Sequence, residues 1–119
     1  MSDVTAIWRE MGRLSITLDE ALSELRKRAV AAAELDNECK LQGARAYLKA
    51  EGKSVKDRES VALIETADIA LKAKIAAALE KSATEAVRSK RQQLSALQTI
   101  ASAHKAEAEF ARTGPPIHP

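Results

Sequence analysis

A ten-residue break, Glu51–Ser60, separates two long alanine-rich segments and gathers three cations at short spacing. These cations are Lys53, Lys56 and Arg58. Clustered lysine and arginine side chains bind phosphate groups and release the counterions that surround a nucleic-acid backbone. The chemistry that this break favours is therefore anion binding; the alternative is that its charges are simply solvated at a surface turn.

A second group of basic residues lies in the longest stretch without an acid, residues 86–106. Because no carboxylate interrupts this stretch, it also favours phosphate, unless it is an ordinary solvated helix face. The chain as a whole carries 19 basic and 17 acidic residues, so its overall charge indicates no partner. The residues of interest are basic, with two amides beside them that can hydrogen-bond: Arg88, Lys90, Arg91, Gln92 and Gln93.

Gly52, Lys53 and Ser54 match the end of the phosphate-binding loop found in nucleotide hydrolases. That motif also needs a glycine five residues before its Gly-Lys pair, and Tyr47 occupies that position. It needs a preceding strand as well, whereas the pattern here predicts a helix. A helix end followed by a serine cap explains the same residues, so we exclude the nucleotide-binding loop.

Side chains for metal or nucleophilic chemistry are few and scattered. The two histidines, His104 and His118, are fourteen residues apart, and the single cysteine, Cys39, has no histidine near it in sequence. A zinc site needs several ligands at short spacing, and a catalytic thiol needs a base. Asp36 falls within a predicted buried stripe, where we expect it to pair with a cation of another helix or subunit. We therefore expect no enzyme activity, no metal and no cofactor.

Two long helical patterns carry these residues, and no segment alternates like a strand. Residues 1–14 predict a short N-terminal helix. Thr17 and Glu20 form a capping-box pattern that begins a helix from Leu18 to Glu51, with Gly52 as its left-handed cap. The predicted buried stripe of this helix has the spacing of a heptad repeat: Leu18, Leu22, Leu25, Ala29, Ala32, Asp36, Cys39, Gly43, Ala46 and Ala50.

Ser54 predicts the N-cap of a second helical segment, which contains no glycine or proline from Val55 to Arg112. An unbroken helix of that length spans roughly 85 Å, too long for a compact monomer. We therefore expect an interruption near Ser82–Thr84, the alternative being an extended oligomer. The predicted apolar stripe of this segment is Ile64, Leu71, Ile75, Ala78, Leu79, Val87, Leu94, Leu97, Ala101, His104, Ala108 and Ala111.

The predicted architecture is an all-α helical hairpin over residues 15–113, bent at residues 51–60 and followed by a flexible tail at residues 114–119. Hydrophobic residues make up 45% of the chain, but 24 of them are alanine and only 3% of the chain is aromatic. Because alanine buries little area, a monomer gains little free energy from such a core. We therefore expect a homo-oligomer, in which five leucines hold the helices together: Leu18, Leu22, Leu25, Leu94 and Leu97.

The single cysteine rules out an internal disulfide, which is typical of proteins in a reducing compartment. The sequence does not begin with a basic segment and an apolar stretch, and no run approaches 18 apolar residues. We expect a soluble, cytoplasmic protein that does not contact a membrane.

Three segments resemble the small recombination mediator proteins of tailed phages: Ala44–Gly52, the helix start Arg58–Ser60, and Arg88–Ile100. The order of these features resembles that family from about Glu34 to Arg112, which is roughly two-thirds of the chain. It implies an all-helical, ring-forming protein that contacts single-stranded DNA through basic residues and helps to load a recombinase. It also implies a protein partner, either the recombinase or a single-strand-binding protein.

The sequence thus predicts a non-enzymatic recombination mediator that binds single-stranded DNA. The alternative is a structural or adaptor protein, such as a virion assembly or helical scaffold component, whose basic residues only solvate its surface. Aromatic platforms for base stacking are limited to Trp8, Tyr47 and Phe110, so we expect binding to be electrostatic and sensitive to salt. The predicted phosphate contacts are Lys53, Lys56, Arg58, Arg88, Lys90 and Arg91.

Overall fold

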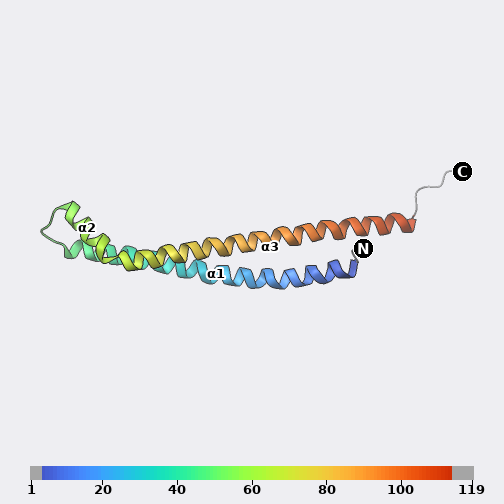
Figure 1. Ribbon diagram of the computed structural model, residues 1–119, viewed down its shortest axis with the longest axis horizontal. Helices are drawn as coiled ribbons and strands as arrows, with labels where there is room; N and C mark the ends of the chain where they lie inside the picture. The colour runs from blue at the N-terminus through green and yellow to red at the C-terminus, as the bar shows by residue number, and fades with distance from the viewer. Residues whose placement is uncertain (1–3, 114–119) are drawn as a thin grey trace. The chain divides into compact units, whose positions relative to one another are not determined.

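The computed structural model describes residues 4–113, and each element within that range is a helix (Figure 1). Helix α1 spans Val4–Lys49, α2 spans Val55–Glu65, and α3 spans Ala67–Thr113. The all-α prediction is confirmed over this range, and the predicted tail at residues 114–119 lies outside it. No helix within residues 4–113 is both long and apolar enough to cross a bilayer.

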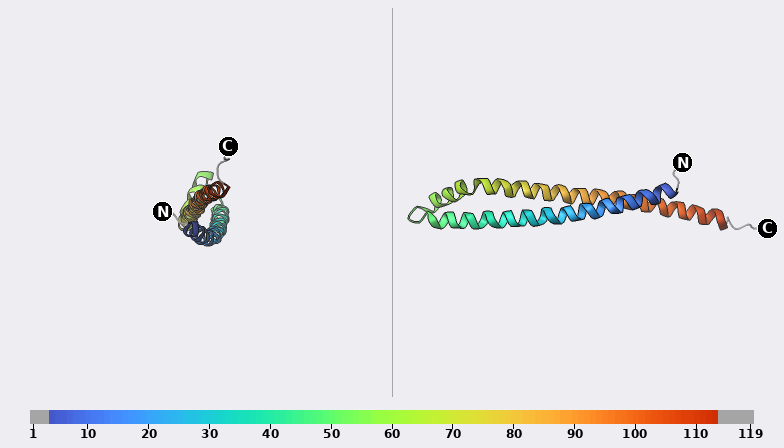
Figure 2. Two further views of the ribbon diagram at one scale, coloured as in Figure 1. Left: turned by 90° about the vertical axis from the view of Figure 1, so that its right-hand side faces the viewer. Right: turned by 90° about the horizontal axis from the view of Figure 1, so that it is seen from below.

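The chain divides into two units, to both of which α1 and α3 contribute. We call Ser23–Glu85 the hairpin unit, and residues 4–22 with 86–113 the terminal unit. In the hairpin unit, the second half of α1 and the first part of α3 run antiparallel and are joined through α2 (Figures 1 and 2). The predicted helical hairpin is therefore present in this unit.

Small side chains form the seam between the two long helices of the hairpin unit. The buried residues there are Ala32, Ala46 and Ala50 of α1 and Ala76 of α3. Because a methyl group takes little room, such a seam lets two helix axes approach closely. It also buries little apolar area, so the seam alone contributes little hydrophobic free energy.

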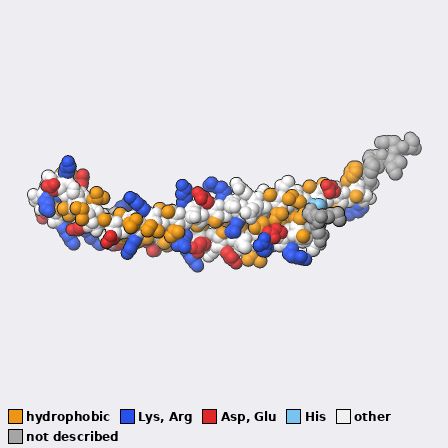
Figure 3. All heavy atoms as spheres, viewed as in Figure 1, with side chains coloured by type: hydrophobic (Ala, Val, Ile, Leu, Met, Phe, Trp, Pro, Cys, Tyr) orange, Lys and Arg blue, Asp and Glu red, His pale blue; other side chains and the backbone are white. Residues whose placement is uncertain are grey.

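In the terminal unit, the start of α1 lies antiparallel beside the end of α3 (Figure 2). Its seam contains larger side chains, namely Ile7, Leu14 and Val87, together with Ala101. The five leucines that the sequence predicted at helix contacts are all half-buried, which fits partial packing in their units. Hydrophobic side chains nevertheless remain visible at the surface (Figure 3).

The predicted helix boundary before Leu18 is wrong, because α1 continues through residues 14–18. Thr17 does not cap a helix there; its hydroxyl donates to the Leu14 carbonyl at 3.0 Å, one turn back within the same helix. Gly12 also lies inside α1, where a glycine costs only about 1 kcal/mol. Neither residue is unfavourable enough to end a helix that packs along its length.

The predicted interruption near Ser82–Thr84 is also wrong, because α3 passes through it. The Thr84 hydroxyl donates to the Glu80 carbonyl at 3.0 Å, which satisfies its polar group without breaking the helix. The chain is interrupted at Thr66 instead, whose φ of −100° and ψ of 6° separate α2 from α3. Thr66 is 7% exposed, and its hydroxyl donates to the Ala62 carbonyl at 2.7 Å.

Gly43 of α1 lies opposite this interruption. A Cβ placed on Gly43 would come within 3.9 Å of the Thr66 methyl carbon. The Thr66 methyl group therefore lies near Gly43, where α1 passes the junction of α2 and α3.

The predicted buried stripe is wrong for the first part of the second segment. Ile64, Leu71 and Ile75 are 75%, 59% and 52% exposed, and Leu79 is exposed too. Alanines take the seam instead, because a close approach of two helices leaves no room there for branched side chains. The seam side of α3 in this unit carries Ala70, Ala73, Ala76 and Ala83, all buried or half-buried.

Three further stripe positions are likewise exposed: Ala78, Ala108 and Ala111. Asp36 differs from its prediction as well. Its side chain is exposed and pairs with Lys40 of the same helix at 3.0 Å, not with a cation of another helix. Exposed pairs of this kind contribute little stability.

Two glycine-to-alanine substitutions should change the free energy of unfolding in opposite directions, because the two glycines differ in backbone conformation. Gly52 has a φ of 86°, and a Cβ there would meet nothing within 4 Å, so Gly52→Ala adds only backbone strain. We expect it to lower the free energy of unfolding by about 1 kcal/mol. Gly12→Ala, in a helix interior with equal space, should raise it by about 0.5–1 kcal/mol. Urea denaturation followed by circular dichroism measures both, and equal signs would contradict this assignment.

Candidate nucleic-acid interface

The bend between α1 and α2 is formed by two helix-capping residues that the sequence predicted. Gly52 adopts the left-handed conformation that ends α1. Ser54 caps α2, its hydroxyl accepting a hydrogen bond from the Asp57 amide at 3.2 Å. Both predictions are confirmed, and together they fix where the nearby cations lie.

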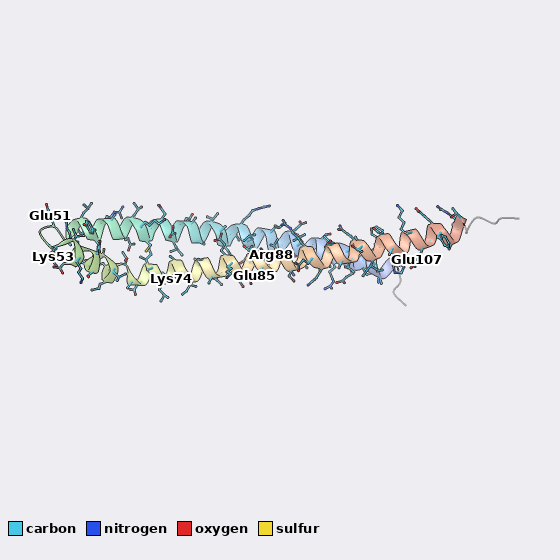
Figure 4. All side chains as sticks on the ribbon, turned by 90° about the horizontal axis from the view of Figure 1, so that it is seen from above. Glu51, Lys53, Lys74, Glu85, Arg88 and Glu107 are labelled. Atoms are coloured by element: carbon cyan, nitrogen blue, oxygen red, sulfur yellow. The ribbon has the colours of Figure 1, made fainter. Side chains whose placement is uncertain are left out.

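Lys53 lies at this bend near Glu51 (Figure 4). Lys53, Lys56 and the neighbouring acids are all exposed. No carboxylate in residues 4–113 comes within ion-pair distance of either lysine. The acids Glu51, Asp57 and Glu59 nevertheless balance the three cations of the break, so its net charge is zero. The bend is therefore a weaker anion site than its lysines alone indicate.

Arg58, the third cation of this cluster, is held within the chain. Its Nε donates a hydrogen bond to the Ala50 carbonyl at 3.1 Å. The guanidinium group also stacks over the Tyr47 ring, with its Cζ 4.9 Å from the ring centroid. Arg58 thus ties the start of α2 to the last turn of α1, which leaves it less free than the two lysines to bind a ligand. This role is structural, and the sequence did not predict it.

Removing the contacts of Arg58 with Ala50 and Tyr47 should destabilise the bend. We expect Arg58→Met to lower the free energy of unfolding by about 1–2 kcal/mol, since it removes a charged hydrogen bond and a cation–π contact. Lys56→Met is the matched control, because Lys56 makes no such contact, and it should stay within about 0.5 kcal/mol of the parent. Thermal and urea unfolding measure the stability of both variants. Equal effects would contradict a stabilising role for the Arg58 contacts.

Ion pairs in residues 4–113 join neighbours on a single helix. The Arg13 guanidinium donates to Glu10 and lowers the pKa of that carboxyl. None of these exposed pairs joins α1 to α3, so they leave the packing of both units to apolar contacts. The pairs are Arg13–Glu10, Arg28–Glu24, Lys40–Asp36 and, when the imidazole is protonated, His104–Glu107.

The basic stretch of α3 in the terminal unit has a clearer arrangement. Residues spaced alternately by four and three lie on one face of a helix. Over residues 88–102 that face carries only hydrogen-bonding side chains and no acid, and Arg91 flanks it. Glu85 lies one turn before Arg88 (Figure 4). The residues of this polar face are all exposed: Arg88, Gln92, Ser95, Thr99 and Ser102.

Lys90 does not share the polar face. It is half-buried and follows the spacing of Val87 and Leu94, which form the seam side of α3. Gln93 also differs, since its amide donates to the Ser89 hydroxyl at 3.4 Å. The structure therefore brings Arg88, Arg91 and Gln92 together and separates the other two predicted residues from them.

Sequence reasoning missed two cations near the bend. Arg45 and Lys49 line a groove of about 260 Å³ with Gln42, Glu65 and Thr66. Their spacing of four residues within a helix would have placed them on one face. Because Glu65 shares the groove, this site is only partly positive.

Within residues 4–113, no three His, Cys, Asp or Glu side chains are close enough together to hold a metal ion. Cys39 is half-buried and free. The chain matches no protein-family model, and neither a search of curated proteins nor a search of solved structures found a match to it.

Proposed function

We propose that this chain is a self-associating, non-enzymatic protein that binds the backbone of single-stranded DNA as an accessory of recombination. The observation that carries the proposal is the polar face of α3, where Arg88 begins an acid-free row of hydrogen-bonding side chains. Such a face suits a phosphate backbone, because arginine and neutral donors contact phosphate without reading bases. A recombinase or a single-strand-binding protein would be its protein partner, in the cytoplasm.

Two features support self-association. The buried core is small and mostly alanine, so one chain gains little hydrophobic free energy. Large apolar side chains remain on outer helix faces, among them Leu63, Ile64 and Leu71. Repeated copies would also multiply the weak charge of each polar face, which raises affinity for a long polyanion.

A structural or adaptor role is the second candidate, and the exposed apolar side chains favour it. They need a protein partner whether or not DNA binds. In that case the polar face of α3 is only a solvated surface, and nucleic acid does not associate even at low salt.

Fluorescence anisotropy with a dye-labelled single-stranded oligonucleotide separates the two candidates. The proposal predicts binding at 50 mM salt that weakens steeply at 200 mM. If four to five cations per chain contact phosphates, the slope of log affinity against log salt is about −3, and affinity falls roughly 60-fold over this range. No binding at 50 mM salt would exclude the DNA-binding role and leave the adaptor.

A further inference from the structure

A large aromatic side chain is exposed in the terminal unit, the unit that also carries the polar face of α3. Trp8 lies in the second turn of α1 and is 60% exposed. The protein has one tryptophan, one tyrosine and one phenylalanine, so aromatic rings are scarce on its surface. Tryptophan is enriched where proteins contact ligands or partners, because its ring offers a large apolar surface. The position of Trp8 on α1 indicates which ligand that is.

Helix geometry places Trp8 on the same side of the terminal unit as the polar face. Each residue of an α-helix is rotated by about 100° from the one before it, and Trp8 comes directly after the seam residue Ile7. Two antiparallel helices that share a seam are related by an approximate two-fold axis, so equal rotations from the seam lead to the same side. On α3, the residues that directly follow the seam positions Val87, Leu94 and Ala101 are members of the polar face: Arg88, Ser95 and Ser102.

Trp8 and the polar face also coincide along the length of the unit. The start of α1 lies beside the later part of α3, whose last turns extend past it (Figures 1 and 2). The start of α1 carries Trp8, and the later part of α3 carries Ser102. Trp8 therefore lies across the seam from the Ser102 end of the polar face, and Arg88 marks the other end.

The acids of α1 leave this side of the unit open to a polyanion. Glu10 is the one acid within residues 4–18, and it comes three residues after Ile7, which places it on the flank opposite Trp8. There its carboxylate pairs with Arg13. On the side of Trp8, the next acid of α1 is Asp19, three turns further along. Residues 4–18 of α1 therefore place no carboxylate between Trp8 and the polar face.

We propose that Trp8 is a stacking platform for a base of the single strand whose backbone follows the polar face of α3. The inference rests on the proposed function and adds a contact with bases to its contacts with phosphate. In a single strand each base presents a flat π face, whereas a duplex buries these faces in its own stack. Stacking on Trp8 gives the protein a preference for single-stranded DNA, which phosphate contacts alone do not provide.

Intrinsic fluorescence tests the contact directly, because the single tryptophan makes the emission report on Trp8 alone. We expect an unlabelled single-stranded oligonucleotide to quench this emission at 50 mM salt. An abasic strand of equal length keeps the sugars and phosphates but has no bases, so it should bind without quenching. Unchanged emission at saturating single-stranded DNA would overturn the inference, because a base on the indole changes its surroundings.

Substitutions separate stacking from a structural role of Trp8. In anisotropy titrations, Trp8→Leu should lower the affinity for single-stranded DNA at least about fivefold, the lower limit for the loss of one stacked base. It should leave the affinity for the abasic strand unchanged, and Trp8→Phe, which keeps a ring, should recover most of the loss. Ile16→Ala is the matched control and should bind like the parent. Ile16 is 63% exposed on the same helix, but it comes two residues after the buried Leu14 and faces away from α3.

The outcomes distinguish the stacking from the proposed function. The parent chain should prefer the single strand to the abasic strand by the same factor that Trp8→Leu loses. Parent-like affinity of Trp8→Leu for single-stranded DNA would overturn the inference, and so would an equal loss on both strands. The inference would also be overturned if Trp8→Leu kept its DNA affinity but lost mass in light scattering, since the ring would then contact another copy. A parent chain that binds neither strand at 50 mM salt would overturn the proposed function itself.

Discussion

The double variant Arg88→Glu with Arg91→Glu is expected to bind single-stranded DNA at least tenfold more weakly at 50 mM salt. Each arginine that contacts a phosphate contributes about 0.7 to the salt slope on a single strand, so the slope should flatten by about 1.4. The two side chains lie on and beside the acid-free polar face of α3, where glutamate would repel the backbone. Anisotropy titrations at several salt concentrations measure both quantities.

The matched control reverses two other cations of α3, Lys105→Glu and Arg112→Glu. These residues are exposed and lie off the polar face, and the change in net charge is the same. The control should lose much less affinity than the double variant at residues 88 and 91. Equal losses would mean that net charge alone drives binding, and the polar face would no longer be the contact surface.

Ala46→Leu is expected to destabilise the hairpin unit by about 1–3 kcal/mol, although leucine is the more hydrophobic residue. Ala46 is only 2% exposed, and it lines a groove together with Thr66. A larger side chain there must push the helices apart. Urea denaturation followed by circular dichroism gives the free energy of unfolding.

Ala6→Leu is the control for this substitution. Ala6 lies in the same helix but is exposed, so the added methyl groups meet no packed neighbour. The free energy of unfolding should then change by less than about 0.5 kcal/mol. If Ala46→Leu stabilised the protein as well, the close alanine seam would be contradicted.

The features that the sequence predicted well are those set by local chemistry. Gly52 ends a helix because it alone adopts a positive φ without strain, and Ser54 begins the next because its hydroxyl accepts a free amide. Both effects act within four residues of chain. The all-α class followed from the helical period over most of the chain.

The errors arose where packing decides the outcome. Thr17 and Ser82–Thr84 are weak helix formers, but their intrinsic penalties are fractions of a kcal/mol, and packing along a long helix outweighs them. The interruption falls at Thr66, a buried residue whose methyl group lies near Gly43, and the two residues are distant in sequence. A single sequence does not reveal such a pairing.

The apolar stripe of α3 was misplaced for a related reason. A rule that puts the largest hydrophobic residues inside selects Leu71 and Ile75 and passes over the alanines. In this chain the close helix approach reverses that choice, and the leucine and isoleucine side chains lie outside. A second copy of the chain that covered these side chains would resolve the conflict.

The candidate site was only partly predictable. The sequence composition located the basic stretch. It did not show that Lys90 lies half-buried on the seam side of α3, whereas Arg88 and Arg91 are exposed. Arg58 was indistinguishable in sequence from its lysine neighbours, and its contacts with Tyr47 and Ala50 emerge only from the folded bend. The sequence thus shows the charge of a segment, whereas the packing of the fold decides which of its charged side chains face solvent.

Sedimentation velocity of the chain with a dye-labelled single-stranded oligonucleotide measures DNA binding and self-association in one experiment. Detection at the dye wavelength follows the DNA, and detection of the protein follows the assembly. We expect that at 50 mM salt the dye moves with a protein species heavier than one chain, and that it separates from this species as salt is raised. Dye that sediments as free oligonucleotide at 50 mM salt, beside a protein of the mass of one chain, would contradict both DNA binding and self-association.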